Sequence, residues 1–244
     1  MKRDIICLIR LFIDSLPKSL RNSKLLFRIA QIIFRIPSSL FQFREEYESN
    51  KYKNLSKFYL SNSKYSLKRI SKKSDINSFH IRLIKKVFKL KSPLSLLDVG
   101  CGTGYLIDQL NLIYPLKKTL GIDFQVKRNN NENIKFKEGD ILKSLRKLPN
   151  SSFEFVTCTH VLEHLPYPKE TLLELRRICN KTLIIICPIE KKFKWCLNYH
   201  INFYINKETF LNFCLGKDYK KNNKLTNFSY YYRLGDMMYV EFLN

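Results

Sequence analysis

A short glycine-rich segment near the middle of the chain has the residue types and spacing of a loop that cradles an anionic ligand. Asp98–Gly104 reads Asp-Val-Gly-Cys-Gly-Thr-Gly and holds three of the seven glycines among 244 residues. It follows an apolar run that predicts a strand and precedes a segment that predicts a helix. Glycines allow positive φ angles and let the backbone approach a ligand closely. The amides at the start of the following helix favour an anionic group, and a plain strand–helix turn is the alternative.

A nicotinamide dinucleotide is another ligand that binds a glycine-rich loop, and the fingerprint of its site is G-x-G-x-x-G. Counting from Gly100, the third glycine of that fingerprint would stand at position 105, which is Tyr105. Counting from Gly102, the pattern fails as well. The sequence therefore disfavours a nicotinamide cofactor.

Acidic residues stand at the ends of successive predicted strands. Asp98 ends the strand before the glycine loop, Asp123 follows it by 25 residues, and Asp140 comes after the next strand. In a doubly wound sheet, ligands bind at the carboxyl ends of the strands near the switch point. A carboxylate there can accept two hydrogen bonds from hydroxyl groups, and it does so more strongly than a neutral side chain. The alternative for Asp123 or Asp140 alone is a helix cap or a turn residue.

Several segments, in this order, resemble the motifs of class I S-adenosylmethionine-dependent methyltransferases. The resemblance is to the branch that modifies quinones, sugars and other small molecules. Leu96–Leu106 resembles the first motif, and Gly121–Asp123 and Glu138–Ile141 resemble the ends of the second and third strands. Ser152–Leu165 resembles the fourth strand with the characteristic segment after it, and Leu183–Pro188 resembles the fifth strand.

The resemblance implies S-adenosylmethionine as the cofactor. It implies that Asp123 binds the ribose hydroxyls and that Asp140 meets the adenine amine. The full set of cofactor-binding residues expected from it is Asp98, Gly100, Cys101, Gly102, Gly104, Asp123, Phe124, Asp140, Ile141, Cys158 and His160. One departure is the length of the crossover, because only ten residues, Phe124–Asn133, separate the second and third strands. A parallel crossover usually needs a dozen or more residues, so we expect a loop in place of the helix.

The pattern from residue 94 onward predicts an α/β fold. We expect a doubly wound, mostly parallel seven-stranded sheet with an antiparallel C-terminal hairpin and an N-terminal helical extension. Asp75 is a candidate cap for the helix before the first strand. The expected strands are 94–99, 119–123, 133–137, 152–157, 183–187, 228–233 and 237–243, and the expected helices are 105–113, 170–178 and 207–215. We expect two parts, a basic helical extension over 1–75 and a methyltransferase domain over 76–244.

Two histidines are candidates for the chemistry of methyl transfer. The reaction needs a nucleophile held in line with the methyl group, and a general base assists when that nucleophile is a hydroxyl. His160 comes just after the fourth strand, and His200 lies in the long loop after the fifth strand. Each is a candidate base or substrate contact, and a hydrogen-bonded histidine without a chemical role is the alternative. We expect Glu163 to anchor its loop and His164 to be structural.

We expect no metal site. The chain has seven cysteines, no C-x-x-C pair occurs, and the spacings match no zinc-ligand pattern. Several cysteines lie in apolar runs, such as Cys187 at the end of the fifth predicted strand. This placement predicts buried, reduced thiols in a cytosolic protein.

The long loop after the fifth strand holds residues that could contact the molecule that accepts the methyl group. Its aromatic residues either line a pocket for a ring-shaped substrate or pack on the core; they are Trp195, Tyr199, Phe203 and Tyr204. No Asn/Asp-Pro-Pro-Tyr motif follows the fourth strand. Resembling enzymes that methylate the amino groups of DNA bases carry that motif, so its absence argues against this reaction.

The N-terminal region is basic and strongly apolar. The whole chain carries 44 Lys and Arg against 21 Asp and Glu, and its formal charge of +23 favours an anionic partner. Within residues 1–43, the segments 4–16 and 24–36 predict amphipathic helices. They suit peripheral contact with an anionic membrane, and the alternative is a lid or helical layer packed on the domain or on a second subunit. No apolar stretch reaches the ~20 residues that span a bilayer. We therefore expect a cytoplasmic protein, either free or peripheral at the inner membrane face.

These motifs predict an enzyme that moves the methyl group of S-adenosylmethionine to a small-molecule, sugar, glycan or lipid-linked acceptor, at an oxygen atom. Two alternatives stay open. One is an RNA methyltransferase that uses the basic surface, and the other is a non-catalytic S-adenosylmethionine-binding protein. No recognised RNA-binding module is visible, so we do not expect nucleic acid as a partner. Nothing in the sequence indicates the oligomeric state.

Overall fold

The computed structural model describes residues 11–33, 38–48, 75–126, 130, 132–192, 194, 198–216 and 227–243. In these residues seven strands form one sheet in the order β3-β2-β1-β4-β5-β7-β6. The strands are β1 (Ser95–Val99), β2 (Lys118–Asp123), β3 (Ile134–Glu138), β4 (Phe153–Thr159), β5 (Cys179–Pro188), β6 (Asn227–Arg233) and β7 (Asp236–Phe242). The first five strands pair in parallel, and β7 pairs antiparallel with β5 and with β6. The predicted α/β sheet with its C-terminal hairpin is confirmed.

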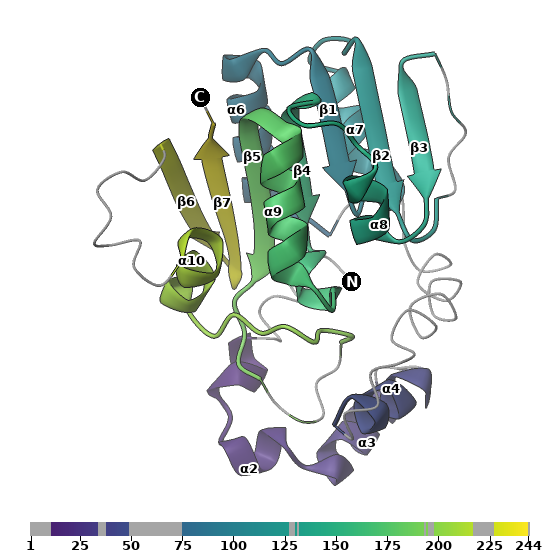
Figure 1. The fold of residues 1–244 in the computed structure, drawn as a ribbon. Helices are drawn as coiled ribbons and strands as arrows, with labels where there is room; N and C mark the ends of the chain where they lie inside the picture. The colour runs from purple at the N-terminus through teal and green to yellow at the C-terminus, as the bar shows by residue number, and fades with distance from the viewer. Residues whose placement is uncertain are drawn as a thin grey trace.

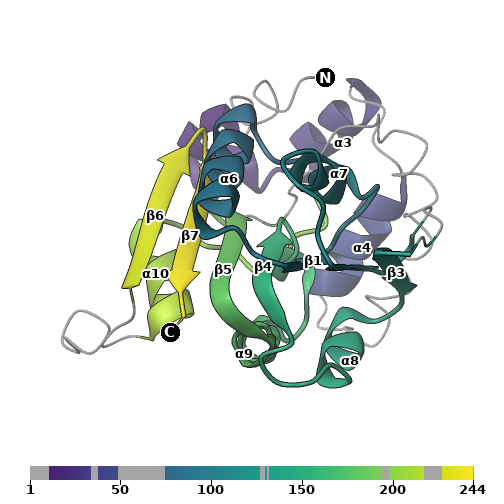
Figure 2. The same cartoon turned by 90° about the horizontal axis from the view of Figure 1, so that it is seen from above.

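Helices cover both faces of the sheet (Figure 1, Figure 2). α6 (Ser78–Lys91) and α7 (Tyr105–Asn111) pack on one face. The other face carries α8 (Ile141–Arg146), α9 (Pro168–Ile178) and α10 (Lys207–Leu215). Neighbouring residues of one strand serve opposite faces, because Leu96 packs in the cluster of α6 and α7 and Leu97 in that of α8, α9 and α10. Burial on both faces explains why the strands read as continuous apolar runs.

Two element boundaries differ from the sequence-based expectation. Asn77 caps α6 in place of Asp75, and its side-chain oxygen accepts a hydrogen bond from the backbone N of His80 at 2.9 Å. β5 begins at Cys179, ahead of the apolar run that predicted it, because the polar residues before Leu183 still pair with β4 across a register shift. The crossover from β2 to β3 contains no helix among its described residues.

The cysteines of the described residues form no disulfide and are buried. They are Cys101, Cys158, Cys179, Cys187 and Cys214. Cys7 and Cys196 lie outside the described residues, as does Trp195.

The N-terminal helices lie beyond the carboxyl ends of the parallel strands (Figure 1). They are α2 (Lys18–Arg21), α3 (Lys24–Ile33) and α4 (Ser38–Glu48), and we call them the N-terminal cap. The cap has a small core of its own, formed by Phe27, Leu40, Phe41 and Phe43, with Tyr199 and Ile201 of the loop after β5 packed against it. Of the helices that the structure describes, none has both the length and the apolarity to cross a membrane.

Candidate active site

The glycine loop after β1 is shaped by close packing on one side and open space on the other. Gly100 and Gly102 have φ angles of 73° and 53°, in the left-handed region. The backbone N of Gly100 donates to the carbonyl of Ile122 at 2.7 Å, which ties the loop to β2. A Cβ at Gly100 would lie 2.0 Å from Cγ2 of Val161, whereas a Cβ at Gly102 would meet nothing within 4 Å. The loop therefore rests on the protein at Gly100 and presents open space at Gly102.

Asp123, at the end of β2, is fixed against this loop. Its Oδ2 accepts a hydrogen bond from the backbone N of Gly102 at 2.7 Å, and its Oδ1 accepts one from that of Gln125 at 3.4 Å. Burial raises the pKa of Asp123, and the hydrogen bonds from backbone amides oppose that rise. Each carboxylate oxygen keeps a further lone pair. Asp123 can thus accept hydrogen bonds from a ligand lying along Gly102.

Asp98, at the end region of β1, is a buried carboxyl beneath the loop. It is 2% exposed, and its Oδ1 accepts a hydrogen bond from Oγ1 of Thr157 at 2.7 Å. Burial raises the pKa of Asp98 to about 7, against the opposing effect of the Thr157 hydrogen bond. A positively charged ligand group nearby would favour its ionised form.

The remaining residues expected to bind cofactor sit in packed or capping positions. Asp140 caps α8, because its Oδ1 accepts a hydrogen bond from the backbone N of Lys143 at 2.8 Å. Ile141 and Cys158 belong to the main core, and Phe124 packs against it, half-buried. Burial raises the pKa of the Cys158 thiol well above its usual range, so this thiol is not a nucleophile. Ile141, Cys158 and Phe124 can form walls of a ligand site, and Asp140 keeps its second carboxylate oxygen as an acceptor.

His160 lies at the end of β4 between two buried carboxylates. Its φ is 55°, unusual for a residue with a side chain, and its backbone N donates to the carbonyl of Ile186 at 2.8 Å. Nδ1 lies 3.4 Å from Oε1 of Glu163, and Nε2 lies 3.9 Å from Oδ2 of Asp236. A strained backbone that aims an imidazole into a polar cluster is typical of functional sites.

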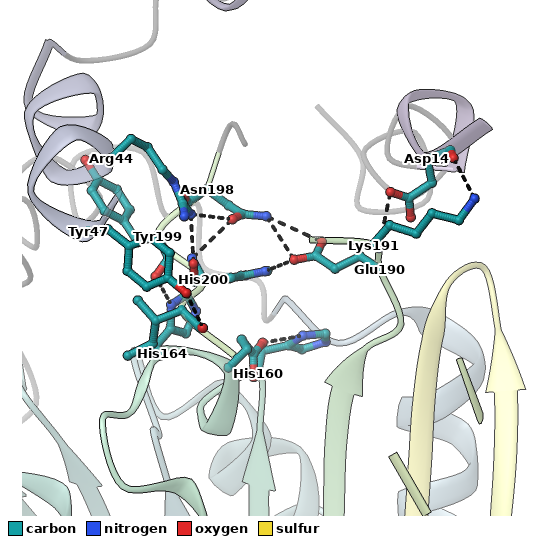
Figure 3. Close-up of polar contacts among 12 residues, drawn as sticks. Asp14, Arg44, Tyr47, His160, His164, Glu190, Lys191, Asn198, Tyr199 and His200 are labelled. Carbon is teal, nitrogen blue, oxygen red and sulfur yellow. Dashed lines mark hydrogen bonds and ion pairs between the residues drawn. The ribbon is translucent and has the colours of Figure 1, made fainter. Parts of the chain in front are cut away.

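His200 lies in the same cluster, beside a second histidine (Figure 3). The two imidazole rings of His164 and His200 stand 4.7 Å apart at 72°. Nδ1 of His164 is 3.2 Å from the carbonyl oxygen of Tyr199, and Nδ1 of His200 contacts Oε1 of Glu190. Burial lowers the pKa of His164 to about 4, so this imidazole is neutral at pH 7. The structure thus brings both candidate bases, His160 and His200, into one cluster.

Glu163 links the two candidate bases. It belongs to the short 3₁₀ helix η2 (Leu162–His164) and is fully buried. Burial by itself would raise the pKa of Glu163, but the neighbouring histidines hold it below its usual range. The backbone carbonyl of Glu163 accepts hydrogen bonds from the backbone N of Ile201 and of Asn202, at 2.8 and 3.0 Å. Glu163 therefore anchors the loop after β5, residues 189–206, which we call the roof loop, and its carboxylate also faces the histidines.

The N-terminal cap holds the loop that carries His200 (Figure 3). Arg44 of α4 is fully buried, and its Nη2 donates to the carbonyl oxygen of His200 at 2.8 Å and to Oδ1 of Asn198 at 3.1 Å. Oη of Tyr47 donates to the carbonyl of Ile201 at 2.9 Å. Sequence reasoning missed Arg44 because its segment shows no clear periodicity. It also missed Glu190, although an acid just past a predicted strand was a signal it used elsewhere.

The aromatic residues of the roof loop divide between two roles. Phe203 and Tyr204 line a hollow of about 650 Å³ that Tyr47 and Tyr167 also line. Tyr199 instead packs edge-on against Phe43 of the cap, with ring centroids 5.1 Å apart. The hollow is apolar enough to take a ring, and it does not include the glycine loop.

Comparisons with known proteins agree with this geometry. The sequence model of a family described as a methyltransferase domain matches residues 73–229. An uncharacterised protein of Methanocaldococcus jannaschii is 34% identical over 117 residues, covering 46% of this chain and 48% of the relative. The mitochondrial ubiquinone biosynthesis O-methyltransferase of Candida albicans is 30% identical over 112 residues, covering 42% of this chain and 34% of the relative. The chain thus spans about a third to a half of the length of these relatives.

A solved structure shares the fold. It is a Nostoc punctiforme protein provisionally assigned as an O-methyltransferase, with a TM-score of 0.51 and 10% identity. The likeness covers 69% of this chain and 57% of that one. At this identity it supports the architecture of the sheet and helices alone.

Proposed function

The chain belongs to the methyltransferase-domain family, and we propose that it transfers the methyl group of S-adenosylmethionine to an oxygen atom of a small-molecule, glycan or lipid-linked acceptor. The observation that carries the proposal is the open space at Gly102 beside the carboxylate of Asp123. Both lie where a doubly wound sheet binds ligands, at the carboxyl ends of β1 and β2. The O-methyltransferase among the relatives supports oxygen as the acceptor atom.

The loop and its acids fit the cofactor. A ligand can lie against Gly102 without meeting a side chain, and Asp123 is oriented to accept hydrogen bonds from ribose hydroxyls. Asp98 adds a buried carboxyl whose ionised form a cationic donor favours. Phe124, which is half-buried beside the core, offers apolar surface for the adenine. When bound, S-adenosylmethionine supplies an electrophilic methyl group on a sulfonium.

The protein's own contribution to the chemistry is orientation and proton removal. Fixing the acceptor oxygen in line with the methyl group can supply about 7–11 kcal/mol of the barrier. His160, held between Glu163 and Asp236 at the end of β4, is the candidate that takes the hydroxyl proton. We expect His160→Gln to lower kcat by about 10²–10⁴-fold.

A labelling experiment tests the proposal. The full chain is incubated with S-adenosylmethionine carrying a tritiated methyl group and, separately, with catechols, sugar nucleotides, a lipid extract or total RNA. Label is expected in one of the first three fractions, with no transfer by Asp123→Asn. Label in RNA would show that the acceptor is RNA and would refute the proposed small-molecule, glycan or lipid-linked acceptor. No label in any fraction, from a chain that binds the cofactor product, would favour a non-catalytic binding protein.

A feature of α3 supports contact with an anionic membrane. Leu25, Ile32 and Ile33 are 69%, 79% and 67% exposed, and the basic residues Lys24 and Arg28 lie on the same short helix. An exposed apolar stripe beside positive charge suits the interface of anionic lipids. A surface-bound enzyme would meet a lipid-linked acceptor in the plane of the membrane.

Vesicle pelleting tests this contact. The full chain should pellet with vesicles containing phosphatidylserine, and Ile32→Ser with Ile33→Ser should abolish pelleting. Leu173→Ser on α9 is the matched control, because Leu173 is also strongly exposed and lies on the sheet's outer layer. Equal pelleting of all three proteins would remove the membrane role of α3.

A further inference from the structure

A buried cluster at the carboxyl end of β4 brings one carboxylate and two imidazoles within reach of a single ion. Glu163 and His164 belong to η2, and His200 belongs to the loop after β5. Figure 3 shows the two histidines of this cluster, His164 and His200. One ligand atom of each lies within 4.8 Å of the others. We propose that these three side chains bind one divalent transition-metal ion that holds the acceptor oxygen for methylation. The acceptor role rests on the proposed function, whereas the ion site itself does not.

The carboxylate of Glu163 is the strongest argument for a cation. It is 0% exposed, and neither of its oxygens makes a hydrogen bond of normal geometry to any residue that the structure describes. The sole ion-pair contact recorded for it among the described residues is with Nδ1 of His160, at 3.4 Å. A buried carboxylate whose closest polar contact is as long as this one costs several kcal/mol. A metal ion between Glu163 and the two imidazoles would supply the missing charge.

The two imidazoles are held in the tautomer that binds a metal through Nε2. The carbonyl of Tyr199 can only accept a hydrogen bond, so Nδ1 of His164 carries the hydrogen. Glu190, when ionised, imposes the same assignment on Nδ1 of His200. Metal-bound histidines characteristically donate their second N–H to a backbone carbonyl or a carboxylate. Both of these supporting contacts are present here.

The donor set selects the class of metal. Two imidazoles and one carboxylate suit Zn²⁺, Mn²⁺, Fe²⁺ or Co²⁺, whereas Mg²⁺ and Ca²⁺ prefer sites built from oxygen alone. Ligand atoms about 2.1 Å from a common ion lie about 3.0–4.2 Å apart. Since no two of the ligand atoms are more than 4.8 Å apart, closing the cluster around an ion shortens the widest separation by about 0.6–1.8 Å at most. The sequence did not predict this site, because cysteine spacing, which indicates zinc sites, plays no part in it.

The ion has a defined part in methyl transfer. Three protein ligands leave coordination positions open, and an acceptor hydroxyl bound there becomes more acidic. The hydroxyl proton goes to a base, for which His160 is the candidate. An oxygen electron pair forms the new C–O bond, the S–C bond breaks with its pair staying on sulfur, and S-adenosylhomocysteine leaves.

The first test measures metal binding in the absence of cofactor. The full chain without a histidine tag is stripped with a chelator, dialysed against Mn²⁺ or Zn²⁺, and analysed by mass spectrometry for metal content. We expect one ion per chain and a rise in Tm on adding metal. Glu163→Gln should weaken binding at least about 100-fold, and the exposed Glu170→Gln, with the same change of charge, should not. Equal metal content in the wild type and Glu163→Gln would overturn the proposal.

Two further measurements keep the proposal testable if Glu163→Gln fails to fold, and they distinguish metal binding from methyl transfer. His200→Gln changes a partly exposed loop residue, and Co²⁺ should give visible absorption bands with the wild type that this variant lacks. S-adenosylhomocysteine is titrated separately. Metal binding without affinity for this ligand would refute the methyl-transfer proposal alone. Affinity for the ligand without metal binding would refute the metal site alone.

Discussion

The two glycines at the turn of the loop should respond differently to the same substitution. Ala at position 102 adds a methyl group that meets no protein atom within 4 Å, and its cost is that of a left-handed alanine, about 1–2 kcal/mol. Ala at position 100 carries the same cost and adds a Cβ 2.0 Å from Cγ2 of Val161. Overpacking of this kind costs about 1–3 kcal/mol more. Gly100→Ala should therefore be the less stable variant by about that difference.

Thermal unfolding and ligand titration together check this reasoning. The difference corresponds to about 2–12 °C in Tm for a chain of this size, and adding Val161→Ala to Gly100→Ala should recover part of it. For the affinity for S-adenosylhomocysteine, we expect Gly102→Ala to be the more damaged variant. Gly102→Ala fills the space proposed for the cofactor and should weaken S-adenosylhomocysteine binding by at least about tenfold, although it is the more stable of the two variants. Equal Tm values for the two single variants would refute the close packing of Gly100 against Val161. Unchanged affinity of Gly102→Ala for S-adenosylhomocysteine would refute the placement of the cofactor beside Gly102.

Three other predictions concern single side chains. The pKa of Asp98 in the folded protein, about 7, lies above its ordinary value of 3.8, so the stability of the wild type should fall as the pH rises from about 4 to 7. At pH 8, Asp98→Asn should therefore have a higher Tm than the wild type. Parallel profiles of Tm against pH for the two proteins would contradict this. Asp123→Asn should weaken S-adenosylhomocysteine binding at least about tenfold by calorimetry, because it loses a charged acceptor. Arg44→Met should speed amide hydrogen exchange in α4 and in residues 198–202, because the substitution leaves buried hydrogen-bond acceptors unpaired. The control Arg82→Met, at an exposed position, should not change the exchange rates there.

The sheet and the glycine loop could be predicted because their signals are local. Each buried strand is a continuous apolar run, and Asp98 and Asp123 follow such runs directly. The parallel pairing of β1 and β2 then brings Asp123 to the loop, where it accepts the hydrogen bond from Gly102. These arrangements depend only on strand order and direction, which the motifs carry.

The histidine cluster could not be predicted because it depends on tertiary register. Asp236 reaches His160 because the start of β7 pairs opposite Pro188, at the end of β5. Arg44 reaches the backbone of His200 across 156 residues of sequence. Neither contact leaves a periodic or motif signal in the chain. The pair Glu163 and His164, with another histidine downstream, was visible in the sequence, but only the fold brings the three side chains together.

Calorimetric titration of the 244-residue chain with S-adenosylhomocysteine, beside a parallel titration with NAD, tests the central claim most directly. The account predicts saturable binding of one S-adenosylhomocysteine per chain and no heat of binding from NAD. A folded sample that binds NAD, or that binds neither compound, would contradict it.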